Sequence, residues 1–191
     1  MDRTNHYERA FEAYLRRSGA RVVPVDESKR SQVDGEPVKS ADFLVVGPGA
    51  TKLVVDVKGR RFPGGSTSKP RPVWQNWSTQ ADLSGLQSWA EGFGEPFRGV
   101  LAFVYEIVAP YRVDADAPDR LTYQGREYLV RGIDVLSYSA TMVPRSRRWG
   151  TVHLPGPAFR ALCRPFSYFF NAATAYPSAS ASTRELSCGG S

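Results

Sequence analysis

The stretch that most constrains the fold is residues 42–61, which read as a β-hairpin. The chain runs Asp-Phe-Leu-Val-Val, then Gly-Pro-Gly-Ala, then Thr-Lys-Leu-Val-Val-Asp-Val-Lys-Gly. Two β-branched runs on either side of a Gly-Pro-Gly turn predict two antiparallel strands. The second run is apolar without interruption from Leu53 to Val55, so we expect this strand to be buried on both faces. Other elements must therefore cover each face of the sheet that contains it.

Three charged residues lie at the open end of this hairpin. Asp56 and Lys58 are two positions apart, and they point to the same face because side chains alternate along a strand. The expected register pairs Phe43 with Asp56 and places Asp42 one step further, at the mouth of the hairpin. Burial of these charges is costly unless the carboxylates hold a cation or pair with the lysine. A cation site and a simple salt bridge between Asp56 and Lys58 are both open.

Apolar periodicity predicts a helix before the hairpin and another after it. Residues 5–19 form an amphipathic helix, with Asn5 as its cap, Glu8 completing a capping box and Gly19 as its stop. Residues 82–93 form a second helix, capped by Ser78 or Thr79. Residues 20–25 and 98–108 read as strands, the first at an edge because it contains a proline. The order is that of a mixed α/β sheet with helices packed on its faces.

Residues 60–79 read as a long loop rich in glycine, serine and proline, and its side chains are basic and aromatic. The chain has a net charge of +6 and a pI of about 9.5, which favours a polyanionic partner. Arginines, lysines and tryptophans on such a loop suit phosphate contact and base stacking, although the tryptophans could equally form a hydrophobic lid. A second basic stretch lies at 142–149. The residues expected to contact nucleic acid are Arg60, Arg61, Lys69, Arg71, Trp74, Trp77, Arg145, Arg147 and Arg148.

Composition divides the chain into three parts. Residues 1–110 carry the elements described above, and we expect them to form the core. Residues 111–170 read as a β-rich extension packed on that core, with a hairpin turn at Gln124-Gly125 and a short helix over 157–162. Residues 171–191 are dominated by alanine, serine, threonine and glycine, and we expect them to be disordered.

The cysteines and the apolar runs bear on the compartment. Two cysteines, Cys163 and Cys188, give neither metal-ligand spacing nor a disulfide framework. The first residues lack a basic-then-apolar signal pattern, and no run is long and apolar enough to span a membrane. We therefore expect a cytoplasmic protein.

An Asp on one hairpin strand, Asp-x-Lys on the other and a Glu on the preceding helix resemble the PD-(D/E)xK nuclease superfamily. The element order is similar to its restriction-endonuclease-like αβββαβ core, and in particular to archaeal Holliday-junction resolvases and Mrr-like domains. The opening His-Tyr-Glu-Arg-Ala-Phe-Glu also looks like the signature of the uncharacterised HYExAFE proteins. The chain departs from the superfamily in two places. Ser40-Ala41-Asp42 replaces Pro-Asp, and the position of a resolvase-like glutamine falls on Asp82.

The resemblance implies a catalytic set of Glu8, Asp42, Asp56 and Lys58. Asp42, Asp56, the Val57 backbone carbonyl and, through water, Glu8 would bind Mg²⁺ or Mn²⁺, since hard cations prefer oxygen ligands. Lys58 would orient the attacking water or stabilise the developing charge. Accessory roles fall on Glu12 and Gln80.

The function implied is that of a metal-dependent endonuclease acting on DNA. A non-catalytic nucleic-acid-binding module on the same fold is an alternative, and an RNA-directed nuclease is a weaker one. Resolvase-like relatives act as dimers, so a homodimer is an open expectation.

Overall fold

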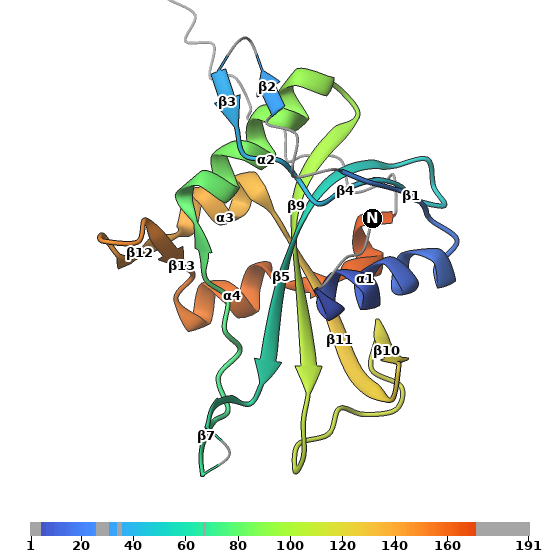
Figure 1. Cartoon of the computed structure of the whole chain (residues 1–191), viewed down its shortest axis with the longest axis vertical. Coiled ribbons are helices and arrows are strands. Elements are labelled where there is room, and N and C mark those ends of the chain that lie inside the picture. The colour runs from blue at the N-terminus through green and yellow to red at the C-terminus, as the bar shows by residue number, and fades with distance from the viewer. Residues whose placement is uncertain (1–4, 26–30, 34–35, 67, 171–191) are drawn as a thin grey trace, which may run out of the picture.

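The computed structural model describes residues 5–25, 31–33, 36–66 and 68–170. Its main element is one mixed sheet of seven strands, in the order β1-β4-β5-β9-β11-β10, with β14 paired beside β11 (Figure 1). These strands are β1 (Arg21–Pro24), β4 (Phe43–Val46), β5 (Lys52–Phe62), β9 (Phe97–Ile107), β10 (Arg120–Tyr123), β11 (Arg126–Asp134) and β14 (Arg164–Pro165). Strands β5 and β9 run parallel and the other neighbours antiparallel. The expected mixed α/β sheet is confirmed, with β1 at its edge.

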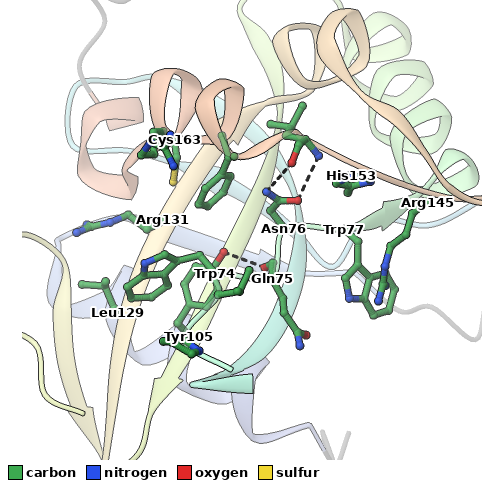
Figure 2. Close-up of a pocket in the computed structure, with 16 residues that line it drawn as sticks. Trp74, Gln75, Asn76, Trp77, Tyr105, Leu129, Arg131, Arg145, His153 and Cys163 are labelled. Carbon is green, nitrogen blue, oxygen red and sulfur yellow. Dashed lines mark hydrogen bonds between the residues drawn. The ribbon is translucent and has the colours of Figure 1, made fainter. Parts of the chain in front are cut away.

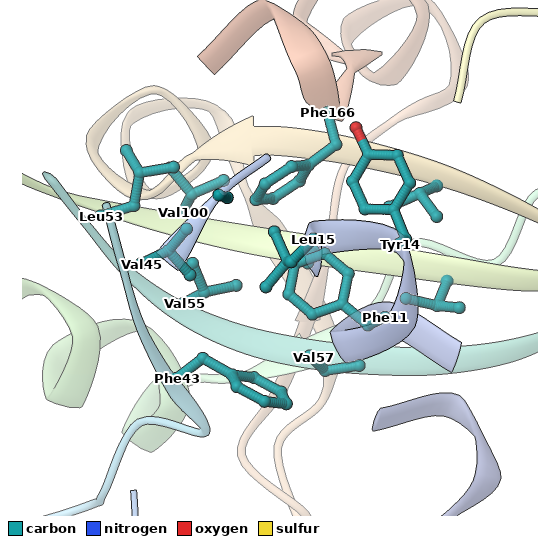
Figure 3. Packing of buried hydrophobic residues seen from close by; sticks show 14 of the residues in the cluster. Phe11, Tyr14, Leu15, Phe43, Val45, Leu53, Val55, Val57, Val100 and Phe166 are labelled. Atoms are coloured by element: carbon teal, nitrogen blue, oxygen red, sulfur yellow. The ribbon is translucent and has the colours of Figure 1, made fainter. Parts of the chain in front are cut away.

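Two helices cover opposite faces of this sheet. Helix α1 (His6–Arg17) packs Phe11 and Leu15 against the face that carries Val55, and Phe166 of the 3₁₀ helix η1 (Phe166–Phe170) joins them (Figure 3). Helix α2 (Gln80–Phe93) covers the other face, where its apolar stripe meets Val54 and the residues of β9 that point the same way. Because β5 is covered on both sides, its uninterrupted apolar run is explained.

The register of the central hairpin is one residue away from the expected one. Phe43 pairs with Val55 instead of Asp56. The turn is tighter than expected, because Val46 pairs with Lys52, Gly47 N donates to Thr51 O at 2.8 Å and Ala50 adopts a positive φ of 61°. In this register Asp42, immediately before β4, lies directly across from Asp56.

The ends of both helices follow their caps. The Asn5 side chain accepts a hydrogen bond from Tyr7 N at 3.1 Å, and Gly19 leaves α1 with a φ of +75°. The Glu8 carboxylate accepts from the side-chain amide of Asn5, at 2.6 Å. Helix α2 has a full capping box, in which Asp82 at its third position accepts from Thr79 N. Thr79 is therefore the cap of a helix that begins at residue 80, two residues earlier than predicted.

The stretch 60–79 is more ordered than the expected loop. Strand β5 continues to Phe62, β6 (Gly64–Ser66) pairs with β7 (Lys69–Arg71), and β8 (Ser78–Thr79) leads into α2. The expected polar loop over 26–40 likewise contains a short pair, β2 (Ser31–Val33) with β3 (Glu36–Val38). Strands β6 and β7 lack the apolar alternation that predicts a strand, because their residues are mostly exposed.

The C-terminal part contributes directly to the main sheet. The predicted hairpin is confirmed, with Gln124 and Gly125 at positive φ between β10 and β11, and β11 pairs along β9. Helix α3 (Val135–Thr141) follows β11 directly. Strands β12 (Val143–Ser146) and β13 (Thr151–His153) form a small sheet with β8, followed by α4 (Gly156–Leu162). The division at residue 110 remains a prediction, and the tail 171–191 lies outside the described residues.

None of the helices in the described part of the chain is both long and apolar enough to cross a membrane.

Candidate functional site

Asp42 is tied to the two residues that flank Asp56. Its backbone N donates to Val55 O at 2.9 Å, and its carboxylate Oδ2 accepts from Val57 N at 2.5 Å. Strand β4 starts only at Phe43, so the side chain of Asp42 takes over the hydrogen bonding of β5 where the neighbouring strand is missing. Phe43, Val55 and Val57 belong to the core beneath α1. By alternation, Asp42 and Asp56 therefore face the α2 side together.

Lys58 lies on the same face and bridges two buried carboxylates. Its Nζ is 2.5 Å from Asp56 Oδ2 and 2.9 Å from Asp82 Oδ2, and its side chain is only 12% exposed. Asp82 belongs to the first turn of α2, and its other oxygen pairs with Lys39. Strand β5 and helix α2 thus supply alternating charges, Asp56, Lys58, Asp82 and Lys39, in one connected network.

The two carboxylates of this network have pKa values displaced in opposite directions. Burial raises the pKa of Asp56, and the attraction of Lys58 offsets this only in part. Burial also acts to raise the pKa of Asp82, but the charge of Lys58 and hydrogen bonds from Lys39, Lys58 and Thr79 N outweigh it and hold this pKa well below its usual value. Asp82 is therefore the firmly ionised member, and Asp56 takes up a proton more readily.

Asp82 and Lys39 were not among the predicted site residues. Asp82 carried one usable signal, since it stands three residues after a Thr at a helix start, where a carboxylate closes a capping box. Ser78 Oγ also donates to Asp82 Oδ2, at 2.9 Å. Lys39 comes from a segment without periodicity, and only the fold brings it to α2.

The predicted acidic residues on α1 are not gathered with Asp42 and Asp56. Helix α1 packs on the opposite face of the sheet, where Glu8 accepts from Asn5 and Glu12 pairs with Arg16 at 2.7 Å. Gln80 is exposed at the first position of α2. The sequence alone could not separate these positions, because a helix that precedes a sheet can cover either of its faces.

The side chains of Arg60 and Trp77 pack against each other, and both are only partly exposed. The Arg60 guanidinium lies 4.0 Å from the centroid of the Trp77 ring and donates to Trp77 O at 2.5 Å and to Gly59 O at 2.8 Å. Arg145 also lies over the Trp77 ring, at 4.9 Å. Trp74 stacks on Phe62, with ring centroids 3.9 Å apart, and so acts as the hydrophobic lid that was one of two open interpretations.

The remaining basic residues predicted to contact nucleic acid are exposed. They lie on the β7 hairpin, at the outer end of β5 and in the turn between β12 and β13, and they comprise Arg61, Lys69, Arg71, Arg147 and Arg148. Their exposure leaves them available to a polyanion, whereas Arg60 is held inside the protein.

The oxygen donors beside Asp56 fit a magnesium or manganese ion. Mg²⁺ is commonly held by one or two carboxylates with water and substrate phosphate completing its shell. Asp42 and Asp56 supply two, and the Val57 carbonyl points to the same edge as Val57 N, because both groups of a strand residue face the same neighbour. Within the described ranges, no three His, Cys, Asp or Glu side chains come together as a metal-binding group. Glu8 is thus not added to the pair as a third direct ligand.

Comparison with known proteins finds similarity among solved structures alone. No family model matches the sequence, and no curated protein matches it. Among solved structures, Hjc, a Holliday junction resolvase from the archaeon Archaeoglobus fulgidus, is similar with a TM-score of 0.47 and 15% identity. The alignment covers 82% of this chain and 92% of that chain. At this level the likeness assigns neither a residue nor an activity.

Proposed function

We propose that this chain is a metal-dependent nuclease that cleaves DNA phosphodiester bonds endonucleolytically. The observation that carries the proposal is the position of Asp42, Asp56 and Lys58 on one face of the sheet, at the point where β4 stops covering β5. Two carboxylates for a hard cation and a cation for a developing negative charge are the groups that phosphodiester hydrolysis needs.

Each residue has a distinct task in this proposal. Asp42 and Asp56 would hold Mg²⁺ or Mn²⁺, which when bound neutralises charge on the phosphate and lowers the pKa of a water. Lys58 would direct its ammonium to the water or to the phosphate oxygens. Asp82 is a positioning residue, because its contact of 2.9 Å with Lys58 Nζ fixes the amine on the α2 side. The exposed arginines and lysine of the β7 hairpin would bind the DNA backbone.

One observation favours a second candidate, a non-catalytic nucleic-acid-binding module. Lys58 is already neutralised by Asp56 and Asp82, at 2.5 and 2.9 Å. A charge network whose only role is to hold β5 against α2 would show the same contacts. The two candidates differ in whether a metal displaces Lys58 from Asp56 and in whether any phosphodiester bond is cut.

The deciding experiment is incubation of the parent and of Asp56→Asn with duplex, single-stranded and branched DNA and with RNA, in Mg²⁺, Mn²⁺ or EDTA. The proposal expects metal-dependent cuts inside circular DNA by the parent. It expects a loss of about a hundredfold or more in Asp56→Asn, because metal activation acts in the transition state. RNA as the only substrate cut would assign the chain to RNA instead.

Stability is measured on the same samples. Asp56→Asn keeps the shape of the side chain but leaves Lys58 with Asp82 as its one charged partner, so it should melt earlier than the parent without unfolding. Lys58→Ala serves as a second variant, and it should lose cleavage but also melt earlier, because it removes the ion-pair partner of buried Asp56 and leaves Asp82 with Lys39 alone. Asp116→Asn, an exposed acid outside the site, is the matched control. A parent that binds DNA and cuts no substrate in either metal would establish the binding module.

A further inference from the structure

A cavity of about 780 Å³ lies on the α2 side of the sheet, outside the carboxylate and lysine network (Figure 2). Its walls are the segment 72–77, β9, β11 and α4. We infer that this cavity binds a single nucleotide, with the base between the aromatic walls and the phosphate at an arginine rim. The volume falls within the range of pockets that enclose small organic ligands.

The walls are aromatic and apolar, as a base requires. Trp74, Tyr105, Leu129 and Phe159 line the cavity. The Trp74 and Tyr105 rings meet edge to face, at 4.8 Å and 82°. Planar bases gain stacking energy on such side chains irrespective of their sequence.

The polar groups at the cavity select an anion. Arg145 and Arg160 line it and are exposed, so they can turn toward a phosphate. No Asp or Glu is among the described residues that line it. His153 also contributes to the wall, and its Nδ1 is buried without a hydrogen-bond partner in the structure.

The wall formed by residues 75–77 is held in place before any ligand arrives. Tyr105 OH donates to Gln75 O at 2.9 Å, and Tyr138 OH donates to Asn76 O at 2.7 Å. The Asn76 amide exchanges two hydrogen bonds with the backbone of Leu154 (Figure 2). A wall fixed in this way loses little entropy on binding, which is the general advantage of a preorganised site.

Consecutive residues of the chain contact the cavity and the charge network of the proposed nuclease site. Trp77 lines the cavity, and the next residue, Ser78, donates to Asp82 of the charge network. A nucleotide in the cavity can be a free monophosphate or an unpaired nucleotide of a bound strand. The second source rests on the proposed function, while binding of a nucleotide as such does not.

The test measures binding by titration calorimetry in EDTA, so that no strand is cut. The ligands are dAMP, a DNA duplex with one unpaired adenine, and the same duplex fully paired. Val73 is 62% exposed at the cavity mouth, so Val73→Glu places a negative charge there without disturbing the core, and Val73→Lys is its matched control. Arg160→Glu is a second charge reversal, on α4.

We expect dAMP to bind with one-to-one stoichiometry. Binding should weaken about tenfold in Val73→Glu and in Arg160→Glu, but not in Val73→Lys, because each reversal places a repulsive charge near the phosphate. If the ligand comes from a strand, the unpaired adenine should tighten duplex binding about tenfold, and the same two variants should abolish that gain. If dAMP binds but the unpaired adenine does not tighten duplex binding, the ligand is the free nucleotide.

The inference is overturned if neither dAMP nor the unpaired adenine binds, or if the reversals and Val73→Lys behave alike. Cleavage is assayed separately on fully paired DNA. A parent that cuts DNA but shows no nucleotide binding removes this inference and leaves the proposed function intact. A parent that binds the nucleotide but never cuts DNA keeps this inference and removes the proposed function.

Discussion

The carboxylate of Asp42 accepts a hydrogen bond of 2.5 Å from the backbone N–H of Val57, at the point where β4 no longer lies beside β5. Asp42 is 6% exposed and Val57 is 8% exposed, so this donor is shielded from water. One carboxylate oxygen is thereby used to complete the sheet. The same residue therefore acts in the fold and, in our proposal, in catalysis, and the two roles can be separated by substitution.

Asp42→Asn should keep the fold and lose cleavage. The amide oxygen of Asn can still accept from Val57 N, whereas the charge that a metal needs is gone. Asp42→Ala leaves this buried N–H unsatisfied and should lower the free energy of unfolding by about 1–3 kcal/mol. Denaturant unfolding and metal-dependent cleavage of both variants provide the measurement. Equal destabilisation by Asn and Ala would show that the hydrogen bond contributes nothing to stability.

Asp82→Asn should destabilise the protein without removing any proposed metal ligand. Asp82 is 4% exposed, forms ion pairs with Lys58 and Lys39, and accepts a hydrogen bond from the Ser78 hydroxyl. Loss of its charge leaves Lys58 with one partner, and breaking such a buried pair costs on the order of 3–5 kcal/mol. Chemical denaturation measures this, with Glu91→Gln, an exposed acid of the same helix, as the control. A loss no larger than that of the control would contradict a structural role for the network.

The contribution of Asp82 should also depend on pH in a fixed direction. Its pKa in the folded protein is below the usual value, so the unfolded chain binds a proton first as the pH falls. The stabilisation is therefore complete above about pH 4, the usual range of an Asp, and is lost as the pH falls through the lower pKa of the folded state. The difference in unfolding free energy between parent and Asp82→Asn should shrink below about pH 4. A difference that stays constant down to pH 2 would contradict the ion pairs.

The part of the fold that could be predicted from sequence is the part whose side chains face the core. The hairpin 42–61, both covering helices and the strand after the second helix each carry an apolar period, and burial imposes that period. The β6–β7 hairpin carries none, since its residues are glycine, serine, lysine, proline and arginine outside the core.

The candidate site was partly predictable for the same reason. Alternation gives Asp56 and Lys58 a common face from the sequence alone. Asp42 joins them only in the observed register, because the expected pairing of Phe43 with Asp56 would have put Asp42 on the other face. Asp82 and Lys39 join them only through the packing of α2, which no local pattern encodes. Arg60 was predicted to contact nucleic acid, but it is held by Trp77, a contact that sequence spacing does not distinguish from a free arginine.

DNA binding should weaken with salt, and the exposed basic residues should set the slope. The combined variant Arg61→Ala, Lys69→Ala and Arg71→Ala should reduce the slope of log K against log salt by about 2–3, since each phosphate contact contributes about 0.9. Arg60 is left in place because its removal would disturb Trp77. Arg16→Ala with Arg17→Ala, on the last turn of α1, is the control for charge alone. If both sets lower the slope by the same amount per charge removed, the β7 hairpin is not the contact surface.

Gly59, directly after Lys58, should be intolerant of a side chain because α1 begins against it. A Cβ at Gly59 would lie 2.3 Å from the Cγ and Cδ2 atoms of Tyr7, so either the Tyr7 ring or the start of α1 must move. Gly59→Ala should therefore lower the free energy of unfolding by about 1–3 kcal/mol, as overpacking does in cores. Tyr7→Ala removes the obstacle, and the double variant should be more stable than the sum of the two losses by about 0.5 kcal/mol or more. Urea unfolding of the parent, both single variants and the double variant gives this coupling directly. Additive losses would show that Gly59 is required for its backbone conformation and not for the close approach of α1.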